Sequence, residues 1–227
     1  FAKKILLEKF VIDKTKIVPI YLGADHIFKK DENTDTIKNF DYDKDYILSV
    51  LSCVKYHNIL NLLKAYKIFL KETHVKINYV IILNVLDKKY FDILTNFVKN
   101  NFEKDTVIFL SNIENRYLSN IYKNSHIYVF TSYSETFGFT TLEAMNYNVP
   151  LLVSKTSALE EINGDIPEYF DPDNIEEIKI KLTEIFQNTK DLKILESSKK
   201  RLNNDQLKKF LWKNNYIQTL ELLKNII

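Results

Sequence analysis

Short apolar runs alternate regularly with segments of helical periodicity through the middle of the chain. Each run is apolar at consecutive positions and rich in β-branched residues, which is typical of strands buried on both faces. Strands that alternate with helices predict a parallel sheet covered on both sides, that is, a doubly wound, Rossmann-like α/β fold. The predicted strands span residues 46–51, 77–83, 106–110, 127–130 and 150–154, and the predicted helices between them span 58–73, 88–100, 114–123 and 138–147.

The segments on either side of this alternating region have a different character. Residues 2–10 predict an amphipathic helix, and residues 16–25 predict an extended stretch that ends in a turn at Gly23. Residues 29–44 are polar and aperiodic, which indicates an exposed loop. Three helical segments follow Asn174. We therefore divide the chain into a helix and linker (1–28), an exposed loop (29–45), a Rossmann-like domain (46–205) and a C-terminal helix (206–227).

Charge and cysteine content narrow the class of partner. The 32 Lys and Arg residues nearly balance 30 Asp and Glu, so a net charge of +2 gives no reason to expect nucleic acid as a partner. Arg116 and Arg201 are the only arginines in the sequence, so lysine, histidine or backbone amides would have to hold a phosphate. The single cysteine, Cys53, suits a reducing compartment, and no signal peptide or long apolar run is present, so we expect a cytoplasmic protein.

The predicted sheet also indicates where a ligand would bind. With the common strand order 3-2-1-4-5-6, the order reverses between the first and fourth strands, and ligands bind beyond the carboxyl ends of those two strands. The segments that follow them are Ser52–Asn58 and Thr131–Phe139. We therefore expect the functional residues to lie in these two segments.

The segment after the fourth strand has the features of an anion site. Gly138 stands at the start of the predicted helix, where the absence of a Cβ lets a ligand approach the backbone closely. Ser134 and Thr136 can cap that helix, and its N-terminal N–H groups favour a bound anion. Glu135 and Glu143 flank the site, and the Glu143 carboxylate can accept bonds from two vicinal hydroxyls. The alternative is that Glu135 only complements the helix dipole and Glu143 is solvated.

The same segment resembles a known family. The sequence "SETFGFTTLEAMNYNVPLLVSKTSALEEINGDIPEYFDP" is similar to the signature of glycosyltransferase family 4, with seven residues between two glutamates, then a proline-led strand, a "SALEE" turn and "YFDP". "KIVPIYLGADHIF" is similar to the interdomain linker of that family, and "KKFLWKNNYIQTL" resembles its closing helix. The resemblance covers nearly the whole chain but only the C-terminal, donor-binding half of a GT-B fold. It implies that residues 1–28 come from a missing N-terminal acceptor domain.

The resemblance assigns roles to individual residues. It implies that the backbone amides of four consecutive residues face the sugar and diphosphate of the donor: Phe137, Gly138, Phe139 and Thr140. Glu143 would bind the ribose hydroxyls, and Glu135 would act as the catalytic carboxylate beside the transferred sugar. Members of the family retain the anomeric configuration. The resemblance therefore implies a retaining activity, the transfer of a hexose from a nucleoside diphosphate sugar. No metal and no cofactor are implied.

The segment after the first strand departs from the family pattern. Leu51 and Ser52 stand where the family has Gly-Arg, and His57 stands where it has a diphosphate-binding lysine. A neighbouring phosphate would favour the charged form of His57, and Lys55 can supply a charge from a shifted position. The resemblance therefore implies that Ser52, Lys55 and His57 contact the diphosphate. The alternative is that Lys55 and His57 are ordinary loop residues.

Several further questions stay open from the sequence. The acceptor would be a sugar, lipid or protein held by the missing N-terminal domain or by a partner chain, with the protein free in the cytoplasm or peripheral to a membrane. "SALEEINGDIPEYFDP" looks most like members that use GDP-mannose. A ring between Asn112 and Tyr117 could flank the base. The altered diphosphate positions also allow a nucleotide-sugar-binding or regulatory module without transferase activity. The acidic residues 41–45 precede the first strand, so we interpret them as a solvated loop rather than a metal site.

Overall fold

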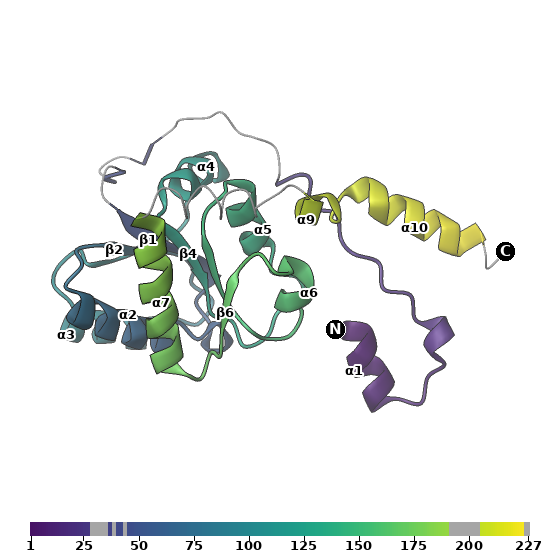
Figure 1. The fold of residues 1–227 in the computed structure, drawn as a ribbon, viewed down its shortest axis with the longest axis horizontal. Helices are drawn as coiled ribbons and strands as arrows, with labels where there is room; N and C mark the ends of the chain where they lie inside the picture. Colours follow the sequence, from purple (N-terminus) through teal and green to yellow (C-terminus); the bar gives the residue numbers. More distant parts are fainter. Residues whose placement is uncertain (28–35, 38–39, 43–44, 191–204, 225–227) are drawn as a thin grey trace.

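A six-stranded parallel sheet forms the centre of the molecule in a computed structural model that describes residues 1–27, 36–37, 40–42, 45–190 and 205–224 (Figure 1). The strand order is β3-β2-β1-β4-β5-β6, and all five pairings are parallel. This order confirms the predicted doubly wound, Rossmann-like fold. The strands span Tyr46–Ser52 (β1), Asn78–Asn84 (β2), Val107–Leu110 (β3), Ile127–Phe130 (β4), Leu151–Ser154 (β5) and Glu168–Phe170 (β6).

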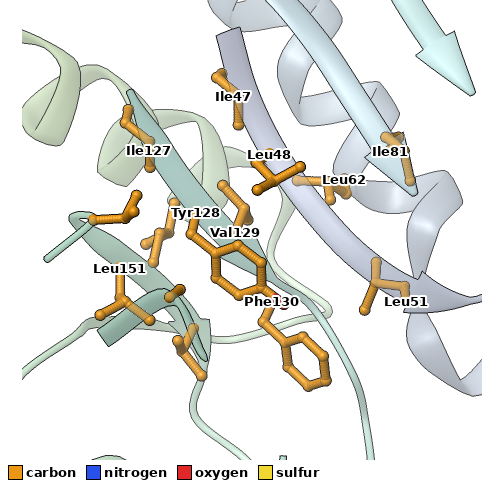
Figure 2. Close-up of a cluster of buried hydrophobic side chains, with 14 of the residues drawn as sticks. Ile47, Leu48, Leu51, Leu62, Ile81, Ile127, Tyr128, Val129, Phe130 and Leu151 are labelled. Carbon is orange, nitrogen blue, oxygen red and sulfur yellow. The ribbon is translucent and has the colours of Figure 1, made fainter. Parts of the chain in front are cut away.

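The strands are buried because helices cover the sheet. All residues of β4 and β5 are buried, as are the first four of β1, in agreement with their consecutive apolar positions. Figure 2 shows this core, with Leu48 of β1, Val129 of β4 and Leu151 of β5 among its side chains. The register of β1 on β2 and β4 brings the carboxyl ends of the central strands together at one edge of the sheet. That edge is where the predicted ligand segments begin.

Helices connect successive strands and pack in two groups. Helix α2 packs against α3 and α7, whereas α5 packs against β4 and β5. The apolar stripe of α2 is buried, as its periodicity predicts. The helices span Ala2–Lys9 (α1), Ile59–Thr73 (α2), Lys88–Asn101 (α3), Asn115–Asn124 (α4), Phe139–Asn146 (α5), Leu159–Asn163 (α6), Ile175–Lys190 (α7), Asp205–Lys208 (α9) and Trp212–Lys224 (α10), with 3-10 turns at Lys14–Lys16 (η1) and Lys55–His57 (η2).

Two asparagines next to the helices adopt a left-handed backbone conformation. Asn148 follows α5 with a φ of 57°, the left-handed conformation that asparagine tolerates. Asn58 precedes α2 with a φ of 55°, and its side-chain Nδ2 donates to the carbonyl oxygen of Pro172 at 2.7 Å. Asn58 therefore ties the start of α2 to the loop after β6.

Three features differ from the sequence prediction. A sixth strand, β6, lies in the "YFDP" segment and pairs with β5, and the "SALEE" turn continues into the short helix α6. The turn expected at Gly23 instead spans residues 25–27 and is closed by a hydrogen bond from the Ile27 N–H to the Ala24 carbonyl at 2.9 Å. Gly23 has another role, because a Cβ at this position would lie 2.6 Å from the Trp212 Cα. Trp212 thus packs directly on the linker backbone.

The first and last helices extend away from the sheet (Figure 1). Neither α1 nor α10 has a buried residue. The linker and α10 meet through hydrogen bonds from the Trp212 N–H to Asp25 Oδ1 and from Asn215 Nδ2 to the Tyr21 carbonyl. No helix among the described residues is long and apolar enough to cross a membrane. Most of the loop predicted for 29–45, and the stretch 191–204, lie outside the described residues.

Candidate active site

A cavity of about 500 Å³ lies at the carboxyl ends of the central strands. Both segments predicted from the reversal of strand order contribute to its wall, so the structure brings them together as expected. Six of the predicted site residues line it: Ser52, His57, Glu135, Gly138, Phe139 and Thr140. The remaining wall comes from the ends of β1 and β2, from Tyr56, Phe130 and Leu118, and from residues 112–113.

The N-terminus of α5 opens on this cavity. Gly138 precedes the helix with a φ of +80°, and a Cβ there would lie 2.7 Å from Leu159 Cδ2, so conformation and packing both favour glycine. No side chain caps the helix, which corrects the expectation that Ser134 or Thr136 would do so. The Thr141 hydroxyl instead donates to the Gly138 carbonyl at 2.7 Å. The uncapped first turn leaves N–H groups and the positive end of the helix dipole for an anion.

Glu135 is fixed at both its backbone and its carboxylate. Its N–H donates to Ser157 Oγ at 2.8 Å, and Ser157 Oγ donates to its carbonyl at 3.0 Å. Its Oε1 lies 3.0 Å from Nε2 of His57. The exposed fraction of the two side chains is only 8% for His57 and 18% for Glu135. The carboxylate therefore has a defined orientation on the cavity wall before any ligand binds.

Glu143 lies on α5 but not on the cavity wall. Its Oε2 accepts a hydrogen bond from the Tyr122 hydroxyl at 2.7 Å, and the Tyr122 ring stacks on Tyr147. Burial raises the pKa of the Glu143 carboxyl, an effect that the Tyr122 hydrogen bond and the nearby His26 partly offset. Burial also raises the pKa of Tyr122 well above its usual value, so Tyr122 remains a donor at neutral pH. The carboxylate is thus held in place by a neighbour on α4.

Two other predicted residues lie off the wall. Lys55 is exposed in η2, and Phe137 is buried between the rings of Phe139 and Phe210. Among the described residues that line the cavity, none is lysine or arginine. Positive potential in the cavity therefore comes from the α5 N-terminus and from His57 when it is protonated.

The sequence prediction missed some of the wall. Tyr56 precedes His57 and is half exposed, and Asn84 ends β2, whose carboxyl end lies beside that of β1. A signal for Asn84 exists, because a polar residue directly follows a buried apolar strand. The segment expected to supply a ring for the base contributes Asn112 and Ile113. The apolar Ile113 can contact the face of a base, and Asn112 can hydrogen-bond its edge.

The fold and the site together define an α/β domain with a ligand cavity at the switch point of a parallel sheet. Residues 30–204 match the family Glycosyl transferases group 1, and the chain belongs to this family. The protein is therefore a glycosyltransferase domain with the Rossmann-like architecture of the GT-B fold. The family assignment confirms that the chain is similar to glycosyltransferases of the GT-B superfamily, as the "SETFGFTTLEAM" segment indicates.

Two curated relatives are similar to most of the chain. O-antigen chain mannosyltransferase B of Escherichia coli is 29% identical over 167 residues, which are 74% of this chain and 42% of the relative. O-antigen chain mannosyltransferase RfbU of Salmonella typhimurium is 26% identical over 176 residues, which are 76% of this chain and 45% of the relative. The chain thus spans less than half the length of these relatives.

Solved structures share the fold at lower sequence identity. The glycosyltransferase from Rickettsia africae ESF-5 superposes with a TM-score of 0.83 and 18% identity, covering 99% of this chain and 61% of that chain. An α,α-trehalose-phosphate synthase (UDP-forming) from Burkholderia xenovorans superposes with a TM-score of 0.72 and 14% identity, covering 89% of this chain and 50% of that chain. These likenesses support the strand order and the layered architecture.

Proposed function

We propose that this chain is the donor-binding, C-terminal half of a retaining glycosyltransferase, which transfers a hexose from a nucleoside diphosphate sugar. The observation that carries the proposal is the uncapped α5 N-terminus, which opens on a 500 Å³ cavity beside a fixed carboxylate, Glu135. A helix N-terminus suits the diphosphate, and a carboxylate suits the sugar hydroxyls and the positive charge that develops at the anomeric carbon. The cavity volume is that of a small-molecule site.

In this proposal each part of the wall has one task. The backbone at Gly138, Phe139 and Thr140 holds the diphosphate, and the Ser52 hydroxyl faces it from the end of β1. Glu135 lies beside the transferred sugar. The Glu143 carboxylate, on α5, is the candidate for the ribose hydroxyls. The contacts of Lys55 and Phe137 with the donor stay predictions. The Lys55 side chain is exposed, and the Phe137 side chain is packed in the core.

The donor and acceptor are proposed from the relatives. Both curated relatives are mannosyltransferases by name. This agrees with the similarity of the "SALEEINGDIPEYFDP" segment to family members that use GDP-mannose. The acceptor, whether a sugar, a lipid or a protein, would be held by an N-terminal GT-B domain or a partner chain, in the cytoplasm or at a membrane surface. Catalysis would need no metal, because the helix N-terminus supplies the positive potential that stabilises the leaving diphosphate.

A nucleotide-sugar-binding or regulatory module is the second candidate. The observation that favours it is that none of the described residues on the cavity wall is lysine or arginine. Without such a charge the departing diphosphate would be stabilised less, whereas binding through backbone amides would remain. Both candidate functions predict binding of a nucleotide sugar, but only the first predicts transfer of its sugar.

Calorimetric titration of the chain with GDP-mannose, UDP-glucose and their nucleoside diphosphates tests the donor proposal. We expect binding of at least one nucleotide sugar at one site per chain, with the same affinity in EDTA. A chain that binds none of them, although folded, would refute both candidates. Product analysis by NMR in a complete enzyme that contains this half then tests retention, because a product of inverted anomeric configuration would contradict it.

A further inference from the structure

Protein atoms contact both ring nitrogens of the His57 imidazole. Nδ1 lies 3.0 Å from the Ser52 backbone nitrogen and 2.7 Å from the Ser52 carbonyl oxygen. Nε2 lies 3.0 Å from Glu135 Oε1. The rings of Tyr56 and Phe130 pack against the imidazole, with centroid distances of 4.6 and 6.0 Å. Both ring nitrogens therefore have partners within the protein, and the ring has little freedom to turn towards a ligand.

The Ser52 peptide group can satisfy both protonation states of the ring. In the neutral ring protonated on Nε2, Nδ1 accepts from the Ser52 N–H and Nε2–H donates to Glu135. In the charged form, Nδ1–H donates to the Ser52 carbonyl and Nε2–H still donates to Glu135. The hydrogen bond from Nε2–H to Glu135 is thus present in both forms. This geometry suits a residue that orients a carboxylate, because the Ser52 peptide group holds Nδ1 while Nε2 contacts Glu135.

We propose that His57 is a positioning residue, which aims the Glu135 carboxylate at the transferred sugar, rather than a ligand of the diphosphate. The proposal rests on the function proposed above and differs from the sequence expectation that His57 replaces the diphosphate-binding lysine. The Ser157 hydroxyl holds the Glu135 backbone, and His57 holds the carboxylate. With Oε1 occupied by Nε2–H, the second carboxylate oxygen, Oε2, is the acceptor for the sugar.

The comparison of a nucleoside diphosphate with its sugar ester separates the two roles. The purified chain is titrated with GDP and GDP-mannose, and with UDP and UDP-glucose, in the wild type and in the His57→Ala, His57→Gln and Glu135→Gln variants. A diphosphate ligand affects both members of a pair equally, whereas a residue that acts through Glu135 affects only the sugar ester. Glutamine at position 57 can still donate to Glu135 and accept from the Ser52 N–H, but it carries no charge.

Four results are expected from these titrations. His57→Ala lowers affinity for the sugar ester roughly tenfold, while affinity for the nucleoside diphosphate changes about twofold or less. His57→Gln restores sugar-ester affinity to within about threefold of the wild type. Glu135→Gln also weakens the sugar ester selectively, and adding His57→Ala to it causes little further loss, because the two residues act as one unit. A general folding defect would move both ligands and would not be rescued by glutamine.

The outcomes that overturn the proposal are distinct from failure of the proposed function. Equal loss of both ligands in His57→Ala, without rescue by glutamine, would make His57 a diphosphate ligand and refute positioning alone. A wild-type chain that binds none of the four ligands would refute the proposed function and this proposal with it. A ligand-free measurement is independent of both: imidazole ¹⁵N spectra should show a hydrogen-bonded Nε2–H that shifts in Glu135→Gln. A neutral ring protonated on Nδ1 would overturn the proposal.

Discussion

Glu143 shows how a single buried carboxylate can oppose folding. Its surroundings remove water from the charged form, and one hydroxyl, that of Tyr122, compensates only in part. A carboxyl whose pKa is raised in the folded state binds protons more tightly there than in the unfolded chain. Stability therefore falls as pH rises from the ordinary value of 4.5 through the raised pKa, and the penalty is complete above it.

Glu143→Gln is expected to stabilise the protein near neutral pH and to weaken nucleotide binding. Glutamine can still accept from Tyr122, but it has no charge to desolvate, so its advantage in unfolding free energy over the wild type should grow from pH 4.5 to pH 7.5. If the ribose assignment holds, nucleotide affinity should fall at neutral pH by about 1 to 3 kcal/mol, because the ribose hydroxyls lose a charged acceptor. Urea unfolding at the two pH values and calorimetric titration measure both effects.

The matched control is Glu221→Gln, a substitution at an exposed glutamate on α10. It should change neither the pH dependence of stability nor the affinity. A Glu143→Gln variant whose stability advantage does not increase with pH would contradict the burial argument. Unchanged nucleotide affinity in the folded variant would remove the ribose assignment and leave the stability argument in place.

The sequence indicated which segments line the cavity better than it indicated the contacts within it. Glu135 and Gly138 were placed by their position after a buried strand and at a helix start, which are local properties. The bond between His57 and Glu135 joins residues 78 positions apart, and no periodicity or spacing encodes that distance in space. The family pattern favoured a diphosphate role for His57 because it aligns positions and does not report which atoms face each other.

At the scale of elements, long buried strands were predictable and short edge structure was not. β1 and β2 each have seven residues and continuous apolar runs, so their period is unambiguous. β6 has three residues at the edge of the sheet, and its burial increases from exposed to buried along its length, so no strand pattern distinguishes it from a turn. Helix caps also depend on context: Gly138, not Ser134 or Thr136, precedes α5 because the chain there must adopt a positive φ.

The junction between the η2 turn and α2 depends on one asparagine, and two substitutions can separate its contributions. Asn58→Gly keeps the left-handed conformation but loses the buried hydrogen bond to Pro172, at a cost of about 1 to 3 kcal/mol. Asn58→Ala loses the bond and also forces a Cβ into the left-handed region, which adds about 1 to 2 kcal/mol. Urea unfolding should therefore rank wild type above glycine and glycine above alanine.

The other end of α2 provides the control for this ranking. His74 ends the helix with a φ of 53° and is exposed. His74→Gly relieves the same left-handed strain without loss of a buried contact, so stability should stay equal or rise slightly. Equal stabilities of Asn58→Gly and Asn58→Ala would show that the left-handed conformation at position 58 costs nothing, contrary to the prediction.

At the scale of the molecule, the linker and the C-terminal helix are joined through Trp212. Gly23→Ala would place a methyl group against the Trp212 backbone, which cannot move aside as a flexible side chain could. The core sheet lies elsewhere, so we expect α10 to shift or detach while the main domain keeps its stability within about 0.5 kcal/mol. Trp212 is the single tryptophan of the chain, so its fluorescence reports this movement directly.

The measurement compares tryptophan emission and urea unfolding in three proteins. Gly23→Ala should shift the emission to longer wavelength in native buffer, because the indole becomes more hydrated, while far-UV circular dichroism retains the sheet signal. Lys213→Ala, an exposed neighbour in the same helix, should leave the emission unchanged. An unchanged emission in Gly23→Ala would mean that the contact between the linker and α10 is not held in solution.

The last prediction concerns what this chain can do by itself: it should bind a nucleotide sugar without transferring the sugar to an acceptor. Binding depends on the cavity, whose described walls all belong to this domain. Transfer also requires an acceptor hydroxyl held next to the anomeric carbon, and such positioning contributes about 7 to 11 kcal/mol to a two-substrate reaction. The chain spans 42% and 45% of two mannosyltransferases to which it is similar, so more than half of each relative lies outside the matched region.

The test incubates the purified 227-residue chain with GDP-mannose and a glycan acceptor and follows product by mass spectrometry. The same preparation must first bind GDP-mannose in the calorimeter, so that absence of product reflects absence of transfer rather than an empty site. We expect no product from the chain alone, and product when it is joined to an N-terminal GT-B half that binds the acceptor. Turnover by the isolated chain would show that the acceptor is held by residues of this domain, with the wall around Glu135 as the first place to look for them.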